Sequence, residues 1–588
     1  MGILTLLITI VILLLAFRYY AAGKITQVVN PNMSRSTPAR RNMDGVEFIP
    51  TPKSILAGYQ FKSISLDLII GPVIAVQFGW LPAVLWVLFG ALFFGWAQDF
   101  LSTIISMREA GRNLSDLVGS YFNPGARTAL LIFIFLYLLI IIGQFGLLIA
   151  TLMARENVPI NILLLGITAF LAGQMIYRWR IHPVWVVSIS LTLVFIGFRI
   201  SLIPSVDQLI AALNQELLGL GSLSHQVAGI SSGHTWLSFF WIVIILLICA
   251  LGAVLPIWRF SVPFNALSSW IILSIISLSI IGLIVGTMNG SISKNFEIPA
   301  ITSSLPPHLG PIWPMLFVTI SSGAVSGWHS LVTTFSSSHQ VEKEPDAFPV
   351  VAGGLFLETI MVVFVIILAA SFGITAGTFD PGQDYALIAG PASVFAAGLA
   401  ETLNVLGFKE SFVDSLGTIL FAIMGITVLQ LAFRYARIVT AALLGKKIQS
   451  LKKVKISTLF ILVVATLIIF SSFTQQLWIL FASANQLLAA ITLLLASNWL
   501  ATNGKSHLWT LLPAGFLFCT GLAALFYSVI YQSLFQQLFF TPEIKFLQIL
   551  EKLVSGSSGI LLGITACYLF FQGTRVLSKL SKERKLKS

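Results

Sequence analysis

Ionisable side chains inside long apolar stretches are the first candidates for chemistry, because an ionisable group in hydrocarbon costs about 2.5 to 3.5 kcal/mol and usually has a functional reason. Asp67 could bind a substrate ammonium group, accept a coupling proton, or form a neutralising pair with nearby Lys62. His329 could relay protons or bind a carboxylate, since imidazole titrates near neutrality, or it could hydrogen-bond to a neighbouring helix. Glu358 could be a relay group or a structural acid that faces the bundle.

Three other charged positions read as interfacial. Asp99 has Arg108 and Arg112 close to it in sequence, and we expect a salt bridge at the membrane surface there. Arg434 and Arg437 lie far along an apolar run, where long basic side chains reach toward the headgroups. We therefore expect these two arginines to anchor the inner end of their helix.

The elements that must position these residues are membrane helices. Of the 588 residues, 57% are hydrophobic and 10% are charged, whereas a soluble domain has roughly 25% charged residues. Apolar runs of the length that crosses a bilayer recur along the chain. We predict an all-α polytopic protein with about fifteen spans: residues 2–20, 54–77, 80–106, 127–153, 159–177, 183–204, 235–255, 264–287, 311–337, 350–375, 414–443, 456–473, 477–500, 508–531 and 547–573. Residues 386–404 read as a surface or re-entrant helix.

The basic residues predict the orientation. Lys and Arg gather in alternate loops and in the tail at 575–587, and such loops face the cytoplasm. The N-terminus is then outside and the C-terminus cytoplasmic, in a plasma (inner) membrane. The net charge of +12 fits basic loops beside anionic lipid and gives no reason to expect nucleic acid.

Two predicted spans contain helix-breaking clusters. The second span has Gly71-Pro72, and the ninth has small residues at 321–327, among them Ser322, Gly323, Ser326 and Gly327. The two spans run in opposite directions, as the inverted repeats of transporters require. We expect two discontinuous helices that expose free backbone groups to a substrate near the midplane. The alternative is that both clusters only kink or pack helices.

The repeats define the predicted organisation. Residues 1–53 form an anchor helix and a basic cytoplasmic loop, and 54–204 form the first inverted repeat of five spans. An inserted helix pair occupies 205–310, and the second repeat occupies 311–500. Residues 501–588 supply two C-terminal helices and a basic tail.

Several stretches resemble the carbon starvation protein A (CstA) family of peptide and pyruvate transporters. They are DGVEFIPT at 44–51, GPVIAVQFGWLP at 71–82, QDF at 98–100, GR at 111–112, SGWHS at 326–330 and ANQLLAA at 484–490. The sequence departs from the family pattern at Tyr59-Gln60, where the family has two histidines. It also departs at 65–70, which carries Asp67, and at Gln430, where the family has an aspartate.

The resemblance implies a LeuT-type core of five plus five helices. In such a core a cation site forms between the first broken helix and the third helix of the second repeat, here near Thr427 and Gln430. Asp67 would then replace the negative charge missing at Gln430. Asn485 and Gln486 could line the pathway, although bonding across helices is the expected role.

These features predict a secondary active transporter that imports short peptides or pyruvate, driven by a proton or sodium gradient. Covalent-enzyme, nucleotide and metal motifs are missing from the sequence, so we expect no enzyme activity, no resident metal and no cofactor. The expected partners are a small-molecule substrate and the bilayer, and the oligomeric state stays open. The alternatives are an ion or solute channel and a transport-inactive sensor or scaffold.

Overall fold

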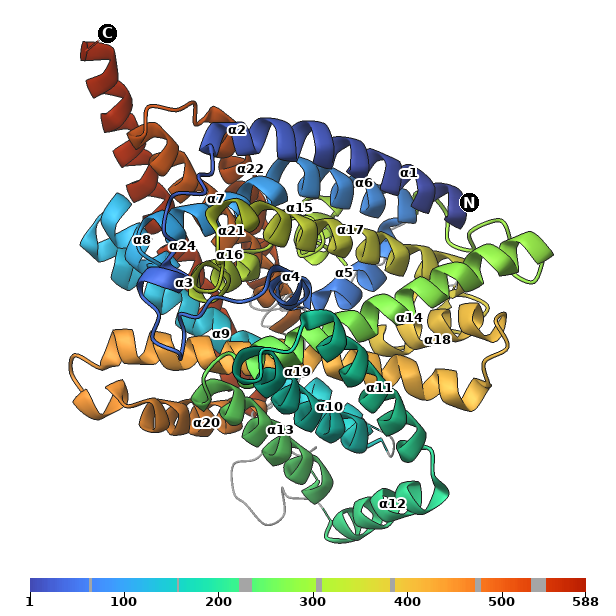
Figure 1. Cartoon of the computed structure of the whole chain (residues 1–588). Coiled ribbons are helices and arrows are strands. Elements are labelled where there is room, and N and C mark those ends of the chain that lie inside the picture. The colour runs from blue at the N-terminus through green and yellow to red at the C-terminus, as the bar shows by residue number, and fades with distance from the viewer. Residues whose placement is uncertain are drawn as a thin grey trace.

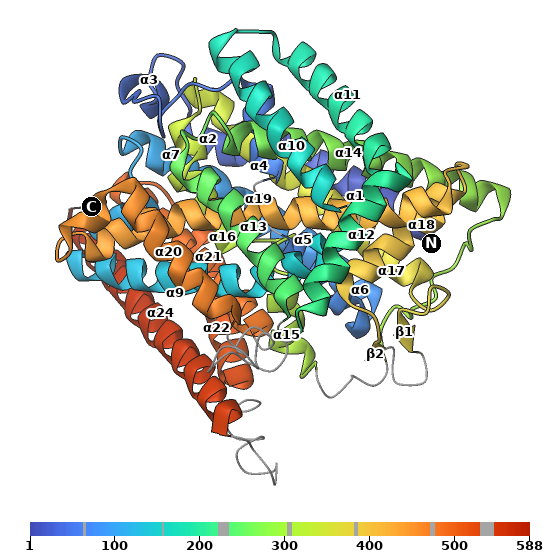
Figure 2. The same cartoon turned by 90° about the horizontal axis from the view of Figure 1, so that it is seen from below.

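The computed structural model describes residues 1–62, 66–155, 158–221, 235–302, 309–380, 386–470, 477–529 and 546–587. It is a bundle of helices with one two-stranded antiparallel hairpin in the described part, β1 (Phe379–Asp380) and β2 (Ala386–Leu387), in which Phe379 faces Leu387. Figures 1 and 2 show the bundle from two sides.

The first half of the chain contains these helices: α1 (Gly2–Ala16), η1 (Phe17–Ile25), α2 (Thr26–Val29), α3 (Pro38–Arg41), α4 (Lys53–Lys62), α5 (Asp67–Ala75), η2 (Val76–Phe78), α6 (Trp80–Gly90), η3 (Ala91–Gly95), α7 (Trp96–Arg108), α8 (Leu114–Tyr121), α9 (Pro124–Met153), α10 (Val158–Gly173), η4 (Gln174–Arg178), α11 (Pro183–Ser201), α12 (Pro204–Gly219), α13 (Trp236–Val254) and α14 (Ser261–Asn289). The second half contains these: α15 (Ile312–Thr319), α16 (Gly327–Phe335), η6 (Ser337–His339), η7 (Glu344–Asp346), α17 (Ala347–Phe372), α18 (Pro391–Asn404), α19 (Glu410–Leu444), η9 (Gln449–Lys452), α20 (Val454–Phe470), α21 (Leu477–Thr502), α22 (Leu508–Phe526) and α24 (Phe546–Lys587).

The protein is a multi-pass membrane protein. Twelve helical stretches of the described chain are long and apolar enough to cross a membrane. The other three predicted spans correspond to shorter pieces: α4 with α5, α15 with α16, and α20. The count of fifteen therefore stays a prediction. Residues 391–404 form α18, which is not among the candidate spans and follows the hairpin.

The predicted break at Gly71-Pro72 is wrong. Helix α4 ends at Lys62 and α5 begins at Asp67, so Gly71 and Pro72 lie inside α5. Proline removes one intrahelical hydrogen bond, and the helix continues past that loss. Gly71 instead permits a close crossing, because a Cβ at this position would lie 2.4 Å from the carbonyl oxygen of Thr319.

The second interruption coincides with the predicted cluster. Helix α15 ends at Thr319 and α16 begins at Gly327, and the chain is not helical at 320–326. Helices of eight and nine residues rise only about 12 to 14 Å each, so each is far shorter than the bilayer. Gly327 permits close packing, since its Cβ would lie 2.3 Å from the carbonyl oxygen of Asn485.

The core lies around α19, α21 and α17. The apolar windows of α19 and α21 are 100% and 94% buried inside the protein, against 17% for the stretch that contains α1. Helix α14 packs against α4, and α21 packs against α16. The large apolar side chains that remain exposed lie mainly on outer helices such as α1, α11 and α24. Figure 1 shows α1 along the edge of the bundle, and Figure 2 shows α11 and α24 at its edges.

Candidate functional site

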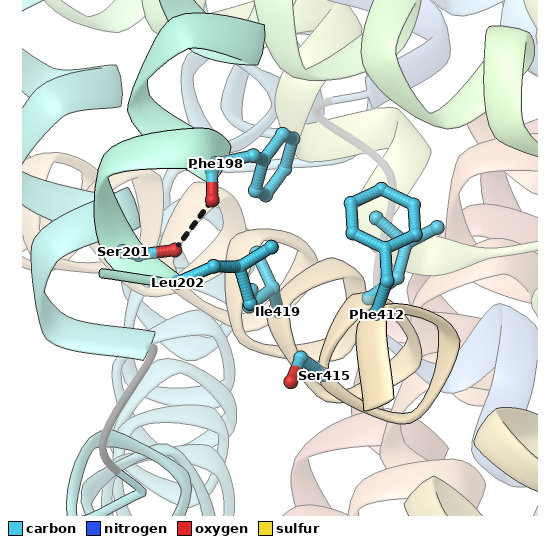
Figure 3. Close-up of a pocket in the computed structure, with 7 residues that line it drawn as sticks. Phe198, Ser201, Leu202, Phe412, Ser415 and Ile419 are labelled. Atoms are coloured by element: carbon cyan, nitrogen blue, oxygen red, sulfur yellow. Dashed lines mark hydrogen bonds between the residues drawn. The ribbon is translucent and has the colours of Figure 1, made fainter. Parts of the chain in front are cut away.

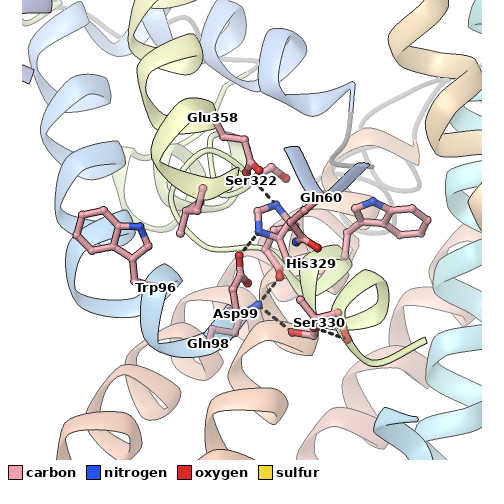
Figure 4. A network of polar contacts seen from close by, with 12 residues as sticks. Gln60, Trp96, Gln98, Asp99, Ser322, His329, Ser330 and Glu358 are labelled. Atoms are coloured by element: carbon pink, nitrogen blue, oxygen red, sulfur yellow. Dashed lines mark hydrogen bonds and ion pairs between the residues drawn. The ribbon is translucent and has the colours of Figure 1, made fainter. Parts of the chain in front are cut away.

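A buried ionisable cluster joins three helices beside the 320–326 interruption (Figure 4). His329, in the first turn of α16, lies between Asp99 of α7 and Glu358 of α17. Its Nδ1 is 2.9 Å from Asp99 Oδ2, and its Nε2 is 3.4 Å from Glu358 Oε2. All three side chains are at most 1% exposed. An imidazole held between two carboxylates can store and pass a proton.

The expected surface salt bridge of Asp99 is wrong. Arg108 pairs with Glu344 at 2.7 Å, and the Arg112 guanidinium donates to the Asp116 carbonyl oxygen. Asp99 and Arg108 are nine residues apart on one helix, which separates them by about 13 Å along its axis. The turn that carries Asp99 is packed against α16, so its carboxylate meets His329 instead.

Asn485 of α21 ties the interruption to α9. Its Oδ1 accepts from the Tyr137 hydroxyl at 2.8 Å, from Ser326 Oγ at 3.1 Å and from the Trp328 N–H at 2.9 Å. Its Nδ2 donates to Ser322 Oγ at 3.0 Å. Three donors thus converge on one oxygen next to the N-terminus of α16, where backbone N–H groups favour anions. The expected cross-helix bonding of Asn485 is present.

Hydroxyl groups fasten α16 to α7. Gln98 Nε2 donates to the Ser326 carbonyl oxygen and, at 2.8 Å, to Ser330 Oγ, as Figure 4 shows. Two further pairs, each at 2.8 Å, are Ser102 of α7 with Thr333 of α16, and Ser106 of α7 with Ser338 of η6, which follows α16. These contacts fix the rotation of α16, and with it the direction in which His329 points.

Asp67 is 4% exposed and begins α5. It interacts electrostatically with His329 and with Tyr137, so the structure brings it to the same region. The expected partner Lys62 ends α4, and its side chain lies outside the described residues. Gly71 and Pro72 follow on α5, where Gly71 contacts the end of α15.

The other predicted positions of the second interruption have structural contacts. Gly323 packs on Val362, because a Cβ on Gly323 would lie 2.5 Å from Val362 Cγ2. The carbonyl oxygen of Gly323 accepts a hydrogen bond from Thr359 Oγ1 at 3.4 Å. Ser322, Ser326 and Gly327 all contact Asn485. The segment is thus held from α17 and from α21.

The predicted cation ligands on α19 have other neighbours. Thr427 Oγ1 donates to the Met424 carbonyl oxygen at 2.7 Å, within its own helix. Gln430 is fully buried and faces α13, since a Cβ on Gly252 would lie 2.9 Å from its Oε1. Leu66 lies near Gly425 of α19 instead. Neither Thr427 nor Gln430 contacts Asp67 through an interaction described in the structure, and their ion-binding role stays a prediction.

Residues 44–51, which we call the strap, cross one end of the bundle just before α4. Asp44 Oδ1 accepts the backbone N–H groups of residues 46–48 at 2.8 to 2.9 Å. Ile49 and Thr51 donate backbone hydrogen bonds to His339 and Gln340. The strap therefore adds a short extended pairing to the segment that follows α16.

The strap is also fastened to α19 by charge. Glu47 Oε1 accepts from Arg434 at 2.7 Å and from Arg437 at 3.0 Å. Arg434 is 1% exposed. It also donates to the carbonyl oxygens of Gly252 and Leu255, at the C-terminal end of α13. The sequence placed these arginines as interfacial anchors but did not reveal their partner, because 387 positions separate Arg434 from Glu47.

Cavities lie at two places between the described helices. One, of about 10 Å³, lies between Phe198 and Leu202 of α11 and Phe412 and Ile419 of α19 (Figure 3). It is mainly apolar and barely reaches the size of one water molecule, so it holds no substrate. The other, of about 320 Å³, lies between α9, α18 and α19. Within the described ranges, no group of three His, Cys, Asp or Glu side chains is arranged to hold a metal ion.

Comparison with curated proteins identifies similar transporters. The peptide transporter CstA of Escherichia coli (strain K12) is 27% identical over 408 residues, covering 67% of this chain and 53% of that protein. The pyruvate/proton symporter BtsT of the same strain is 28% identical, covering 65% of this chain and 50% of that protein. The peptide transporter CstA of Bacillus subtilis (strain 168) is 26% identical, with 87% of each chain covered. The chain spans about half the length of the first two.

Solved structures of transporters also match at low similarity. A mutant manganese transporter of Eremococcus coleocola has a TM-score of 0.40 at 10% identity, covering 91% of this chain and 99% of that one. MhsT in complex with L-phenylalanine has a TM-score of 0.42 at 13% identity, covering 90% and 99%. At TM-scores this low, no common fold follows. The family model described as "Carbon starvation protein CstA", however, matches residues 1–383 and 381–524. The chain therefore belongs to the CstA family, whose curated members named here are transporters and not enzymes.

Proposed function

We propose that this protein is a secondary active transporter that imports small carboxylate-bearing nutrients, either short peptides or pyruvate, driven by a proton or sodium gradient. The observation that carries the proposal is the fully buried Asp99–His329–Glu358 cluster at the interruption between α15 and α16. Ionisable groups inside a membrane bundle are expensive and mark substrate or proton pathways. The names of the similar E. coli proteins, a peptide transporter and a pyruvate/proton symporter, support the same substrate classes.

The cluster suits coupling because several groups that can bind a proton lie next to one another. Asp99, Glu358 and the nearby Asp67 supply three carboxylates, and His329 supplies one base that can become a cation. These buried carboxylates would attract an entering proton or sodium ion. His329 would then pass a proton between Asp99 and Glu358 as the two sides of the membrane become accessible in turn.

The substrate carboxylate would bind at the N-terminus of α16. The three donors that meet on Asn485 Oδ1 come from Tyr137, Ser326 and the Trp328 backbone. An amide oxygen carries only a partial charge, whereas charge-assisted hydrogen bonds to a carboxylate are roughly twice as strong as neutral ones. We propose that the incoming carboxylate takes over some of these donors and that Asn485 holds them in place until then.

Alternating access would use two discontinuous membrane helices, α4 with α5 and α15 with α16. Because the strap leads directly into α4 and bonds to the segment after α16, a swing of α4 must pull on Glu47 and its two arginines. The strap would thus close the cytoplasmic side in this conformation. The proposal uses the orientation predicted from the basic loops, with the N-terminus outside and the C-terminus in the cytoplasm of a plasma membrane.

Proteoliposomes test the proposal. Labelled pyruvate and short peptides should accumulate against their gradient when a proton or sodium gradient is imposed. Glu358→Gln should abolish accumulation while substrate exchange across the membrane continues, because exchange needs no net movement of the coupling ion. Asp116→Asn, which removes a carboxylate from α8 outside the cluster, is the matched control and should accumulate normally. Wild-type vesicles that accumulate neither substrate class, or a Glu358→Gln protein that accumulates as well as wild type, would refute it.

A further inference from the structure

The cavity of about 320 Å³ has features of a binding site that the central cluster does not explain. The outer end of α9 forms one wall with Leu152 and Arg155, and Thr418 of α19 forms another. The third wall is one face of α18, which carries Ser393 and small alanine side chains. We call this space the outer chamber. Its volume falls in the range of about 300 to 1,000 Å³ that small-molecule sites occupy.

The chamber walls select for a small anion. Arg155 is the one charged side chain among its described lining residues, and Ser393 and Thr418 add hydroxyl groups. A guanidinium offers five donors in a planar fork that matches a carboxylate. The alanines leave room for a methyl group or for another small substituent. The complementary ligand is therefore a short carboxylate with a small apolar part, such as pyruvate or a dipeptide of small residues.

The helices α9 and α19 that line the chamber also meet at an apolar contact further along their length. Ile149 precedes Leu152 by one turn of α9, and Gly425 follows Thr418 by two turns of α19. A Cβ on Gly425 would lie 1.9 Å from Ile149 Cδ1 and 3.6 Å from Leu66 Cδ2, so these two side chains pack closely on Gly425. Leu66 is followed at once by Asp67, which belongs to the region of the buried cluster.

We propose that the outer chamber is an admission subsite, in which Arg155 binds the carboxylate of an incoming substrate before the substrate passes the contact of Ile149, Gly425 and Leu66. This inference rests on the proposed transport function and on the orientation that places α18 outside. The positive-inside distribution makes basic residues scarce on that face. Arg155 would therefore be one of few groups there that attract an anion.

Thiol labelling tests the chamber without relying on transport. Ser393→Cys places a reactive group in the wall, in a background in which the exposed Cys519 and Cys567 are replaced by alanine. With Arg155 present, pyruvate and dialanine should slow labelling. Arg155→Gln should remove that protection. It should also lower the rate with an anionic reagent by about five-fold, the effect of one unit charge at neighbouring distance in water, and should not lower the rate with a cationic one.

Uptake kinetics supply the second readout. Arg155→Gln should raise the KM for pyruvate by about ten-fold or more with an unchanged maximal rate, because a charge-assisted hydrogen bond is lost from binding. Arg155→Lys should show a smaller effect, and Lys294→Gln, which removes an exposed charge from another loop of the same face, should show none.

The outcomes separate the two proposals. If uptake proceeds but substrate gives no protection and the KM of Arg155→Gln is unchanged, the outer chamber is not a binding site, although transport stands. If substrate protects Ser393→Cys in an Arg155-dependent way but no gradient drives accumulation, the binding site stands and the proposed transport function fails.

Discussion

Replacing Asn485 by alanine removes four hydrogen bonds at once from the centre of the molecule. The Tyr137 hydroxyl, Ser326 Oγ and the Trp328 N–H lose their shared acceptor, and Ser322 loses a donor. Side-chain hydrogen bonds in membrane proteins average about 0.6 kcal/mol each, so four give about 2.4 kcal/mol. Donors left buried without an acceptor cost about 1 to 3 kcal/mol each in soluble proteins. The expected loss in the free energy of unfolding is therefore at least about 2 kcal/mol.

Gln486 is the matched control, because it is the next residue of α21 and equally buried. Among the described residues, neither atom of its amide has a hydrogen-bond partner. Gln486→Ala removes a larger side chain but none of these bonds, and should cost less than Asn485→Ala. Reversible unfolding in mixed micelles measures both values. If the two variants are equally stable, Asn485 does not organise the interruption.

The same variant tests the proposed exchange of partners. A ligand that binds only the folded state stabilises it by RT ln(1 + [L]/Kd). Because Asn485→Ala frees three donors, pyruvate should stabilise the variant more than it stabilises the wild type, although the empty variant is weaker. A smaller ligand effect in Asn485→Ala than in wild type would show that the carboxylate does not use these donors.

Three further results are expected. Glu47→Gln should lower the free energy of unfolding by about 1 to 3 kcal/mol, since its two arginines lose a charged acceptor. Glu342→Gln, which removes a charge from an exposed ion pair, should change it little. Equal effects of the two substitutions would show that Glu47 does not fasten the strap to α19. Gly71→Ala should cost about 1 to 3 kcal/mol and impair uptake, since its Cβ would lie 2.4 Å from a backbone oxygen of α15, while Gly353→Ala, in open space, should be silent. Burial lowers the pKa of His339 below 6.5, so the folded protein favours the neutral ring. The stability that depends on the neutral ring is fully present above pH 6.5 and is lost as the pH falls below 6.5. Thermal unfolding at pH 7.5 and pH 5 should therefore show a larger acid loss in wild type than in His339→Gln.

Much of the architecture could be predicted from the order of residue types. Apolar length predicts a polytopic protein, because a helix must satisfy its backbone within the bilayer and this requirement is local. The cluster at 321–327 predicts where the chain leaves the helix between α15 and α16, since small residues act on their own turn. The short motifs in the sequence also predict the family, and the family match over most of the chain confirms this prediction.

Tertiary structure decided what the local pattern could not. Gly71-Pro72 serves a helix crossing rather than a break, because its role depends on Thr319, which lies far away in sequence. Asp99 meets His329 and not the arginines near it, because the packing of α7 on α16 sets the direction of its side chain. Helices in the core are apolar on nearly every side, so periodicity does not encode which faces meet. Only the packed bundle brings residues 99, 329 and 358 together, and that contact made the candidate site.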